Sequence, residues 1–284
     1  MSRFSLQTRR SKDRAATLLL YCAALLLCAG VFFALYFVAS RGWQVISWEF
    51  ITEPPRDGMT AGGIWTPLVG TLQLTFLSMM ATIPVGVATG LYFSEYASDN
   101  AFTRILRLAI RSLAGVPSVV FGLFGLSLFV VLLGFGSSML SASLTLACLA
   151  LPLMITASEQ AFMAVPKEYR DASYALGATR WQTICKVVFP SAASTVVTGI
   201  ILSVGRVAGE TAPIIFTGAA FYTPGLARSI FEEVMALPYH IYVLATAGVN
   251  IEQTRPIQYG AILVLVVLVL SVSSLGIWMR RRRL

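Results

Sequence analysis

The chain has 284 residues, of which 57% are hydrophobic and 12% are charged, and its formal net charge is +8. A soluble domain usually carries about 25% charged residues, so this composition excludes an ordinary soluble enzyme or binding module and predicts an integral membrane protein. The basic excess is better explained by membrane orientation than by nucleic-acid binding, because of where it lies along the chain.

Six apolar stretches satisfy the length of about 20 residues that one membrane crossing requires. We expect an all-α membrane fold with spans at 17–38, 69–93, 116–134, 142–163, 192–220 and 259–279. Residues 1–16 are expected to form a cytoplasmic N-terminal segment, and 17–284 a single transmembrane domain. The first span is expected to remain as an anchor, because it is longer than the core of about 7–15 residues in a signal peptide.

Lysine and arginine are concentrated before the first span, in every second loop, and at the C-terminus. Loops rich in these residues stay on the cytoplasmic side, so both termini and the loop at 164–191 are expected there. The basic residues are Arg3, Arg9, Arg10, Lys12, Arg14, Arg104, Arg107, Arg111, Lys167, Arg170, Arg180, Lys186 and Arg280 to Arg283. The opposite loops hold six acids, which agrees with an outward position.

The sequence of the loop at 164–191 predicts two short helices joined by a glycine. Pro166 suits a helix start, Gly177 suits the position just after a helix end, and Thr179 suits a second N-cap. The second helix is amphipathic and includes Trp181. A compact knob with exposed apolar side chains predicts docking to a partner; the alternative is that it folds back beneath its own helices.

Two carboxylates and one guanidinium stand inside predicted spans. Arg206 and Glu210 are four residues apart, a spacing that places them on one face of a helix. A charge at the bilayer centre costs at least about 2.5–3.5 kcal/mol and usually faces a bundle interior or a watery path. The pair therefore indicates either a structural ion pair or a substrate pathway. Glu159, near the inner end of the fourth span, is expected to reach water or to relay movement.

The outward segment at 221–258 predicts a helix over Ser229–Leu237 that Pro238 ends. The single histidine, His240, has no second histidine or cysteine nearby, so we expect no metal site and a hydrogen-bonded or solvated imidazole.

The loop at 164–191 contains a spaced motif made of Asp171-Ala172-Ser173, Gly177 and Val187-x-Phe189-Pro190. This motif resembles the EAA loop of type I ABC importer permeases, with conservative departures at Asp171, Ser173, Val187 and Phe189. We call residues 164–191 the coupling loop below. The resemblance implies that Asp171, Ala172, Ser173 and Gly177 shape a contact with an ATP-hydrolysing subunit. It also implies that Pro190 marks the return of the chain into the membrane.

Other strings resemble the phosphate branch of these permeases, and within it the A-type subunits. They are Leu113 to Gly125, Arg206-Val-Ala-Gly-Glu-Thr-Ala-Pro213, Gly70-Thr-Leu, Pro84-Val-Gly86 and Ser94-Glu-Tyr-Ala97. The resemblance implies a permease of the bacterial inner membrane that forms half of a phosphate pathway containing Arg206, Glu210 and Thr211. It further implies a homologous second permease, two ATP-binding subunits and an external phosphate-binding protein as partners.

The chemistry of the residues agrees with this resemblance. A guanidinium offers a fork of donors to a tetrahedral oxyanion, and a nearby carboxylate keeps that anion from being held too tightly. No Gly-Lys dipeptide occurs, so the phosphate-cradling loop of an ATPase is absent and ATP hydrolysis is expected on partner subunits. No cofactor is expected.

Three alternatives stay open. The first is an ABC permease for another oxyanion, such as molybdate or phosphonate, because a guanidinium does not distinguish tetrahedral anions. The second is a secondary transporter in which Glu210 or Glu159 carries a proton. The third, a membrane-embedded enzyme, has no recognisable metal cluster or set of nucleophile, base and orienting residue behind it.

Overall fold

A computed structural model describes residues 3–223, 225–247 and 251–281. Part of the basic C-terminal tail, residues 282–283, lies outside this description. Five helices are long and apolar enough to cross a membrane. They are α1 (Arg3–Gly42), α3 (Trp65–Leu91), α6 (Met139–Met163), α9 (Phe189–Gly209) with the helical residues before it, and α12 (Ile251–Arg281). The predicted helical membrane fold is confirmed in the described residues, which also contain one short two-stranded sheet.

A sixth candidate span is bent. It joins α4 (Ala101–Leu113) to α5 (Ser118–Gly125) and the π-helical η4 (Leu126–Leu132), with an angle of 101° between the two parts. Sequence patterning placed this span at 116–134 and its three arginines in a loop, whereas the structure makes those arginines part of a helix. Asn100 explains the helix start, because its side chain accepts a hydrogen bond from the Thr103 amide at 2.8 Å.

Short elements connect these helices. On one side of the body they are η1 (Trp43–Val45), α2 (Trp48–Thr52), β1 (Pro55–Arg56), η2 (Asp57–Met59) and β2 (Ala61–Gly62). The two strands are antiparallel and pair Pro55 with Gly62. The remaining elements are η3 (Tyr92–Tyr96), α7 (Lys167–Ala175), α8 (Arg180–Thr183), η5 (Ile184–Val188), α10 (Ala212–Ile215) and α11 (Leu237–Thr246).

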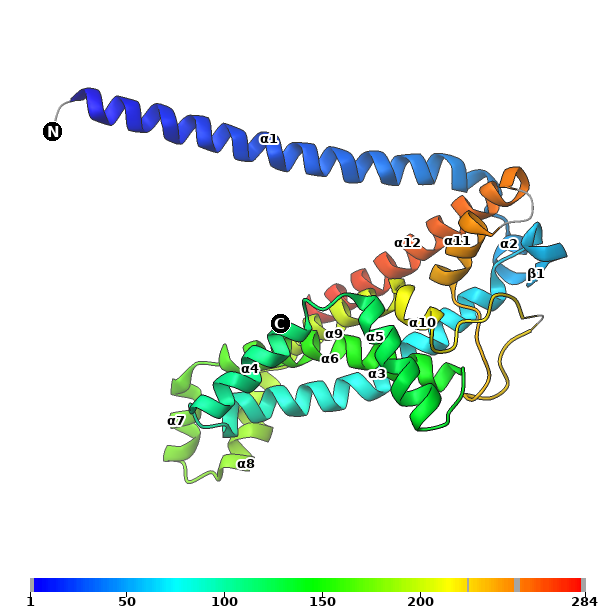
Figure 1. Ribbon diagram of the computed structural model, residues 1–284. Coiled ribbons are helices and arrows are strands. Elements are labelled where there is room, and N and C mark those ends of the chain that lie inside the picture. The colour runs from blue at the N-terminus through cyan, green and yellow to red at the C-terminus, as the bar shows by residue number, and fades with distance from the viewer. Residues whose placement is uncertain (1–2, 224, 248–250, 282–284) are drawn as a thin grey trace.

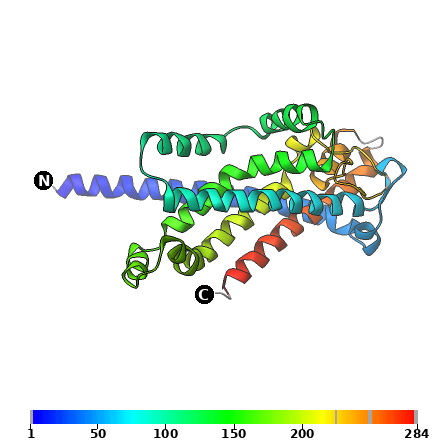
Figure 2. The same ribbon diagram turned by 90° about the horizontal axis from the view of Figure 1, so that it is seen from below.

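The core lies where α3, α6 and α9 pack along one another. Figure 2 shows these helices running lengthwise between α7 and α8 at one end and the segment of α10 and α11 at the other. Glycines allow α3 and α6 to approach closely: a Cβ atom on Gly90 would stand 2.7 Å from the backbone nitrogen of Glu159. Leu146, Met154 and Phe162 of α6 are almost fully buried. This packing fixes α3 and α6 as the central pair.

Helix α1 projects away from this core (Figure 1), and no residue of its most apolar 18-residue window is buried. It contacts the rest of the protein at its C-terminal end, where the Phe37 ring meets the Tyr259 ring edge-on with centroids 5.8 Å apart. The chain therefore leaves a long apolar helix for lipid or for another subunit to cover.

The segment predicted as a span over 192–220 is not one continuous helix. Helix α9 ends at Gly209, and Glu210 is extended with φ −78° and ψ 131°. The chain then forms the four-residue α10, with Pro213 in its first turn. Pro213 fixes its own φ and has no amide to continue the helical ladder from Gly209. The break places Glu210 at the C-cap of α9 instead of within it.

The outward helix predicted over Ser229–Leu237 is wrong. The backbone there is used by neighbouring segments: the amides of Met139 and Leu140 donate to the carbonyls of Glu232 and Ile230, and Ala219 pairs with Val234 as in a parallel sheet. Pro238 begins a helix instead of ending one, because proline suits the first turn, where its missing amide would have no partner. Residues 229–236 thus cap the start of α6.

His240 also differs from expectation. It is 2% exposed, and among the described residues neither ring nitrogen has a hydrogen-bond partner. Burial lowers the pKa of His240 to about 4, whereas the unfolded value is about 6.5. Between about pH 4 and 6.5 the unfolded chain binds a proton at His240 that the folded chain does not. The stability that the neutral imidazole provides is therefore complete above the unfolded pKa and is lost as the pH falls to the folded pKa.

We therefore expect the chain to lose about 3 kcal/mol of stability as the pH falls from about 7 to below 4. Thermal unfolding in detergent across this pH range measures the loss. The variant His240→Phe should remove most of the decline, since it has no proton to bind. An equal decline in the variant and the parent would show that His240 is not its source.

Candidate substrate pathway and coupling loop

The coupling loop has the two-helix geometry that the sequence predicts. Helix α7 is followed by Gly177 in the left-handed region with φ +80°. Thr179 then caps α8 through a capping box, in which its hydroxyl accepts from the Gln182 amide and the Gln182 side chain accepts from the Thr179 amide. These local rules fix the shape of the loop without help from distant segments.

Large apolar side chains on this loop face outward. Leu176 is 89% exposed, and Trp181 and Tyr169 are also exposed, whereas Ile184 is buried. Asp171, Ala172 and Gly177 are exposed as well. The loop thus presents an unpartnered surface of mixed polarity at its tip, and it does not fold back to bury that tip beneath the described helices.

Ser173 and Pro190 occupy different places from these tip residues. The Ser173 hydroxyl lies 2.9 Å from that of Thr183 and so joins the two short helices. Pro190 lies in the first turn of α9, within a helical run from Arg180 to Gly209. The π-helical η5 just before it provides the wide turn that a proline ring and its missing amide require. No break in the helix occurs at Pro190.

Arg206 and Glu210 form an ion pair near the end of α9. The Arg206 Nε atom lies 3.5 Å from Glu210 Oε1, and the side chains are 33% and 19% exposed. The predicted pairing therefore exists, although Glu210 lies beyond the helix end and not on a shared helical face. Because a third of the Arg206 side chain is accessible, its guanidinium is not sealed between packed helices.

Glu210 also borders a narrow cavity of about 10 Å³ between α3, α9 and α11. Thr71 and Thr75 of α3 and Pro238 of α11 contribute to its lining. Thr211, the third predicted pathway residue, follows Glu210 and is half-buried. The structure thus brings Arg206, Glu210 and Thr211 together where the end of α9 meets α3.

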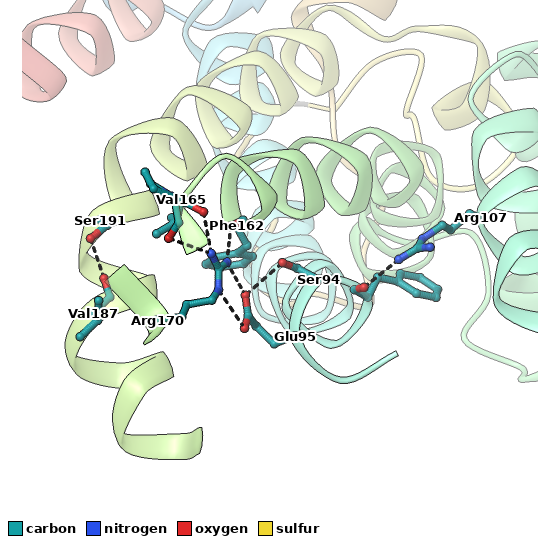
Figure 3. A network of polar contacts seen from close by, with 10 residues as sticks. Ser94, Glu95, Arg107, Phe162, Val165, Arg170, Val187 and Ser191 are labelled. Carbon is teal, nitrogen blue, oxygen red and sulfur yellow. Dashed lines mark hydrogen bonds and ion pairs between the residues drawn. The ribbon is translucent and has the colours of Figure 1, made fainter. Parts of the chain in front are cut away.

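Glu159 does not reach water. It is buried, and its Oε1 atom accepts a hydrogen bond from Arg107 Nε at 2.6 Å, while Arg107 Nη2 donates to the carbonyl of Phe93 at 2.8 Å. A second buried pair joins Arg170 to Glu95 (Figure 3). Sequence patterning treated both arginines as orientation anchors. The one available signal was Glu159 itself, since a carboxylate within an apolar span requires a partner.

Comparison with known proteins places the chain among transport proteins. Residues 82–283 match the family model described as binding-protein-dependent transport system inner membrane component. The probable ABC transporter permease protein YqgI of Bacillus subtilis is 35% identical over 95% of this chain and 96% of its own. The phosphate transport system permease protein PstA of Mycobacterium leprae is 34% identical over 94% of this chain and 88% of its own.

Solved structures share the architecture. A bacterial ABC transporter involved in alginate import matches with a TM-score of 0.65 over 99% of each chain at 15% identity. The MetNI methionine ABC transporter, in an inward-facing conformation, matches with a TM-score of 0.60 over 78% of this chain and 94% of its own at 19% identity. At these identities the likeness shows a common fold.

Proposed function

Because this chain belongs to the family of binding-protein-dependent transport system inner membrane components, we propose that it is the permease subunit of an ATP-driven importer of inorganic phosphate. It is a transport component and not an enzyme. The observation that carries the choice of phosphate is the match over nearly the whole chain to relatives named as phosphate transport system permeases. We place both termini, and with them the coupling loop, on the cytoplasmic side.

The proposed pathway contains Arg206, Glu210 and Thr211. Arg206 offers charged N–H donors to an oxyanion at a position that is still one-third accessible. Glu210, 3.5 Å away, competes for the same guanidinium, so a passing anion is attracted without being trapped. The extended backbone at Glu210 ends helix α9 there, and Glu210 lines the narrow cavity beside α3.

The exposed tip of the coupling loop is the proposed contact for one of two ATP-binding subunits. Leu176 and Trp181 supply apolar surface, and Asp171 supplies charge. A homologous second permease is the proposed cover for the apolar surface of α1, which the chain itself leaves unburied. A phosphate-binding protein completes the assembly on the opposite side, where residues 229–236 and α11 lie.

The two competing transport hypotheses receive less support. The two carboxylates that a proton-coupled carrier would use are both paired with arginines, Glu159 with Arg107 at 2.6 Å and Glu210 with Arg206 at 3.5 Å. A different oxyanion would use the same donors, so the relatives named for phosphate are what favour phosphate.

Reconstitution tests the proposal. Proteoliposomes that hold this chain with its second permease, ATP-binding subunits and binding protein should accumulate phosphate when ATP is supplied. Uptake should continue when a protonophore collapses the proton gradient, and excess molybdate should not compete. Uptake that follows the proton gradient without ATP would support the secondary transporter instead, and uptake of molybdate in place of phosphate would support the other oxyanion.

A further inference from the structure

The guanidinium of Arg170 joins three elements at the cytoplasmic end of the protein (Figure 3). From α7, its Nη2 atom donates to Glu95 Oε1 of η3 at 2.7 Å and to the carbonyl of Phe162 in α6 at 2.8 Å. Its Nη1 atom donates to the carbonyl of Val165 at 2.6 Å. The Arg170 and Glu95 side chains are 15% and 6% exposed. The Arg170 guanidinium is thus buried and held by hydrogen bonds to several elements, unlike the guanidinium of a surface ion pair.

The two carbonyls explain why Arg170 holds α7 to α6 so firmly. Phe162 lies in the last turn of α6 and Val165 lies just beyond its end, where the helix dipole is negative. The Phe162 carbonyl also accepts a hydrogen bond from the Val165 amide at 3.3 Å. A guanidinium placed there satisfies the carbonyls and the dipole together. Moving α7 relative to α6 would expose those groups and break charge-assisted hydrogen bonds.

A second guanidinium holds the same part of η3 from the opposite side. Arg107 of α4 donates to the carbonyl of Phe93 at 2.8 Å and pairs with Glu159 of α6. Phe93 and Glu95 are two residues apart, so the end of α3 is gripped by α4 on one side and by α7 on the other. We call Glu95, Arg107, Glu159 and Arg170 the inner clamp. It unites α3, α4, α6 and α7 at one end of the protein.

The second half of the coupling loop, from Arg180 onward, continues into α9. From Arg180 a helical run of 30 residues continues to Gly209, a length of about 45 Å at 1.5 Å per residue. Arg206 lies near its far end. Gly177 separates this rod from α7, and the Ser173–Thr183 hydroxyl contact links the two halves. One half of the loop is thus tied to α3 and α6, and the other to the arginine of the proposed pathway.

We propose that Arg170 and Glu95 are positioning residues that make α3 and α6 follow the coupling loop when a bound ATPase subunit moves it. With the pair intact, displacement of the loop carries α3 and α6 together while α9 follows α8, so the narrow cavity that Glu210 borders between α3 and α9 changes. Without the pair, α7 moves alone and ATP hydrolysis no longer drives the pathway. This inference rests on the proposed function, and it adds to that function the contact that transmits movement.

The test compares transport with hydrolysis in the reconstituted full complex. Glu95→Gln removes the charge with little change in shape, and we expect it to lower phosphate uptake per ATP hydrolysed by about tenfold, within the usual range of coupling between sites. Binding of the ATPase subunit and the hydrolysis rate should persist. If the two residues act as a pair, Glu95→Gln combined with Arg170→Gln should be no worse than either single variant.

The chain offers a matched control. Arg104 of α4 and Asp99, which lies just before that helix, form an ion pair of 2.9 Å, but both side chains are exposed. Arg104→Gln should leave uptake per ATP unchanged, because exposed pairs contribute little. Unchanged coupling in Glu95→Gln would overturn the inference. Release of the ATPase subunit from Glu95→Gln would also overturn it, since the pair would then serve docking and not transmission.

A spin-label distance measurement provides a second test. It does not depend on which ion is transported, and it can be made on the conservative variant Arg170→Lys. Spin labels at Tyr92, which begins η3 at the end of α3, and at Lys167, which begins α7, lie at exposed positions. They report the separation of the end of α3 from α7 once the native cysteines are replaced. In the otherwise unchanged complex this distance should stay constant between the nucleotide-free state and the state trapped with ATP and vanadate. In the conservative variant Arg170→Lys it should vary. A distance that changes without the Arg170 substitution would overturn the inference even if the cargo proved not to be phosphate.

Discussion

Arg206→Gln should reduce ATP-driven phosphate uptake by roughly 10- to 100-fold, because hydrogen bonds to a charged group contribute about 1.5–3 kcal/mol. Glutamine keeps part of the length and two donors but loses the charge. In the unmodified protein this charge is one-third accessible and lies 3.5 Å from Glu210. Transport is measured as initial uptake into proteoliposomes at equal amounts of assembled complex.

Glu210→Gln should fail in a different way. Removing the competing carboxylate leaves Arg206 free to hold the anion, so uptake falls while phosphate retained by the purified complex rises. Equilibrium binding of labelled phosphate to the complex distinguishes the two variants. If the pair lies in the pathway, Arg206→Gln lowers phosphate retention and Glu210→Gln raises it. If the pair is only structural, both variants lower the stability of the protein instead.

The control for both variants is another ion pair whose two partners are close to each other in the sequence. Arg56 and Glu53 are three residues apart, with nitrogen and oxygen 3.7 Å apart, and their side chains are more exposed than those of Arg206 and Glu210. Arg56→Gln should transport normally. If Arg206→Gln and Glu210→Gln also transport normally in intact complexes, neither residue is required in the pathway.

Local patterns in the sequence predict the coupling loop and much of the membrane fold, for a physical reason. The glycine at 177 and the cap at Thr179 act within a few residues, and an apolar stretch of sufficient length is visible without knowledge of its neighbours. The comparisons with known permeases agree with the predicted fold class and transport role. The assignment of Arg206, Glu210 and Thr211 to a pathway stays a prediction.

What local patterns missed depends on contacts between distant segments. Glu95 and Arg170 are 75 residues apart, and Glu159 and Arg107 are 52 apart, so neither pair has a sequence spacing to detect. The segment 229–236 has helical periodicity, yet its carbonyls are taken by the start of α6. Tertiary hydrogen bonds overrode a weak local preference there. Basic residues near span ends, such as Arg107 and Arg170, thus form packing contacts that a rule for membrane orientation does not reveal.

Gly177→Val should release the ATP-binding subunit from the complex in detergent, giving at least about a tenfold loss of co-purified ATPase. Left-handed backbone costs a residue with a side chain about 1–2 kcal/mol, and a β-branched residue tolerates it least. The chain can avoid this strain by abandoning φ +80°, which changes the angle between α7 and α8 and misplaces Leu176 relative to Trp181. Gly177→Asn should retain more ATPase, because asparagine enters this region more readily.

Gly134→Val is the matched control. Gly134 has φ +68°, and, as at Gly177, no atom lies within 4 Å of the position that a Cβ would take. Gly134 lies between η4 and α6 and outside the coupling loop, so its valine variant bears the same kind of backbone strain but should keep the ATPase. Retention of the ATPase by Gly177→Val would rule out the loop geometry as the docking determinant. No atom lies within 4 Å of the position that a Cβ at Gly177 would take, so the first side-chain carbon of valine meets no clash within this chain. Loss of the subunit would then come from the altered angle between α7 and α8 or from direct contact of the new side chain with the partner. Gly177→Asn distinguishes these causes, since asparagine is as large as valine yet tolerates the native backbone.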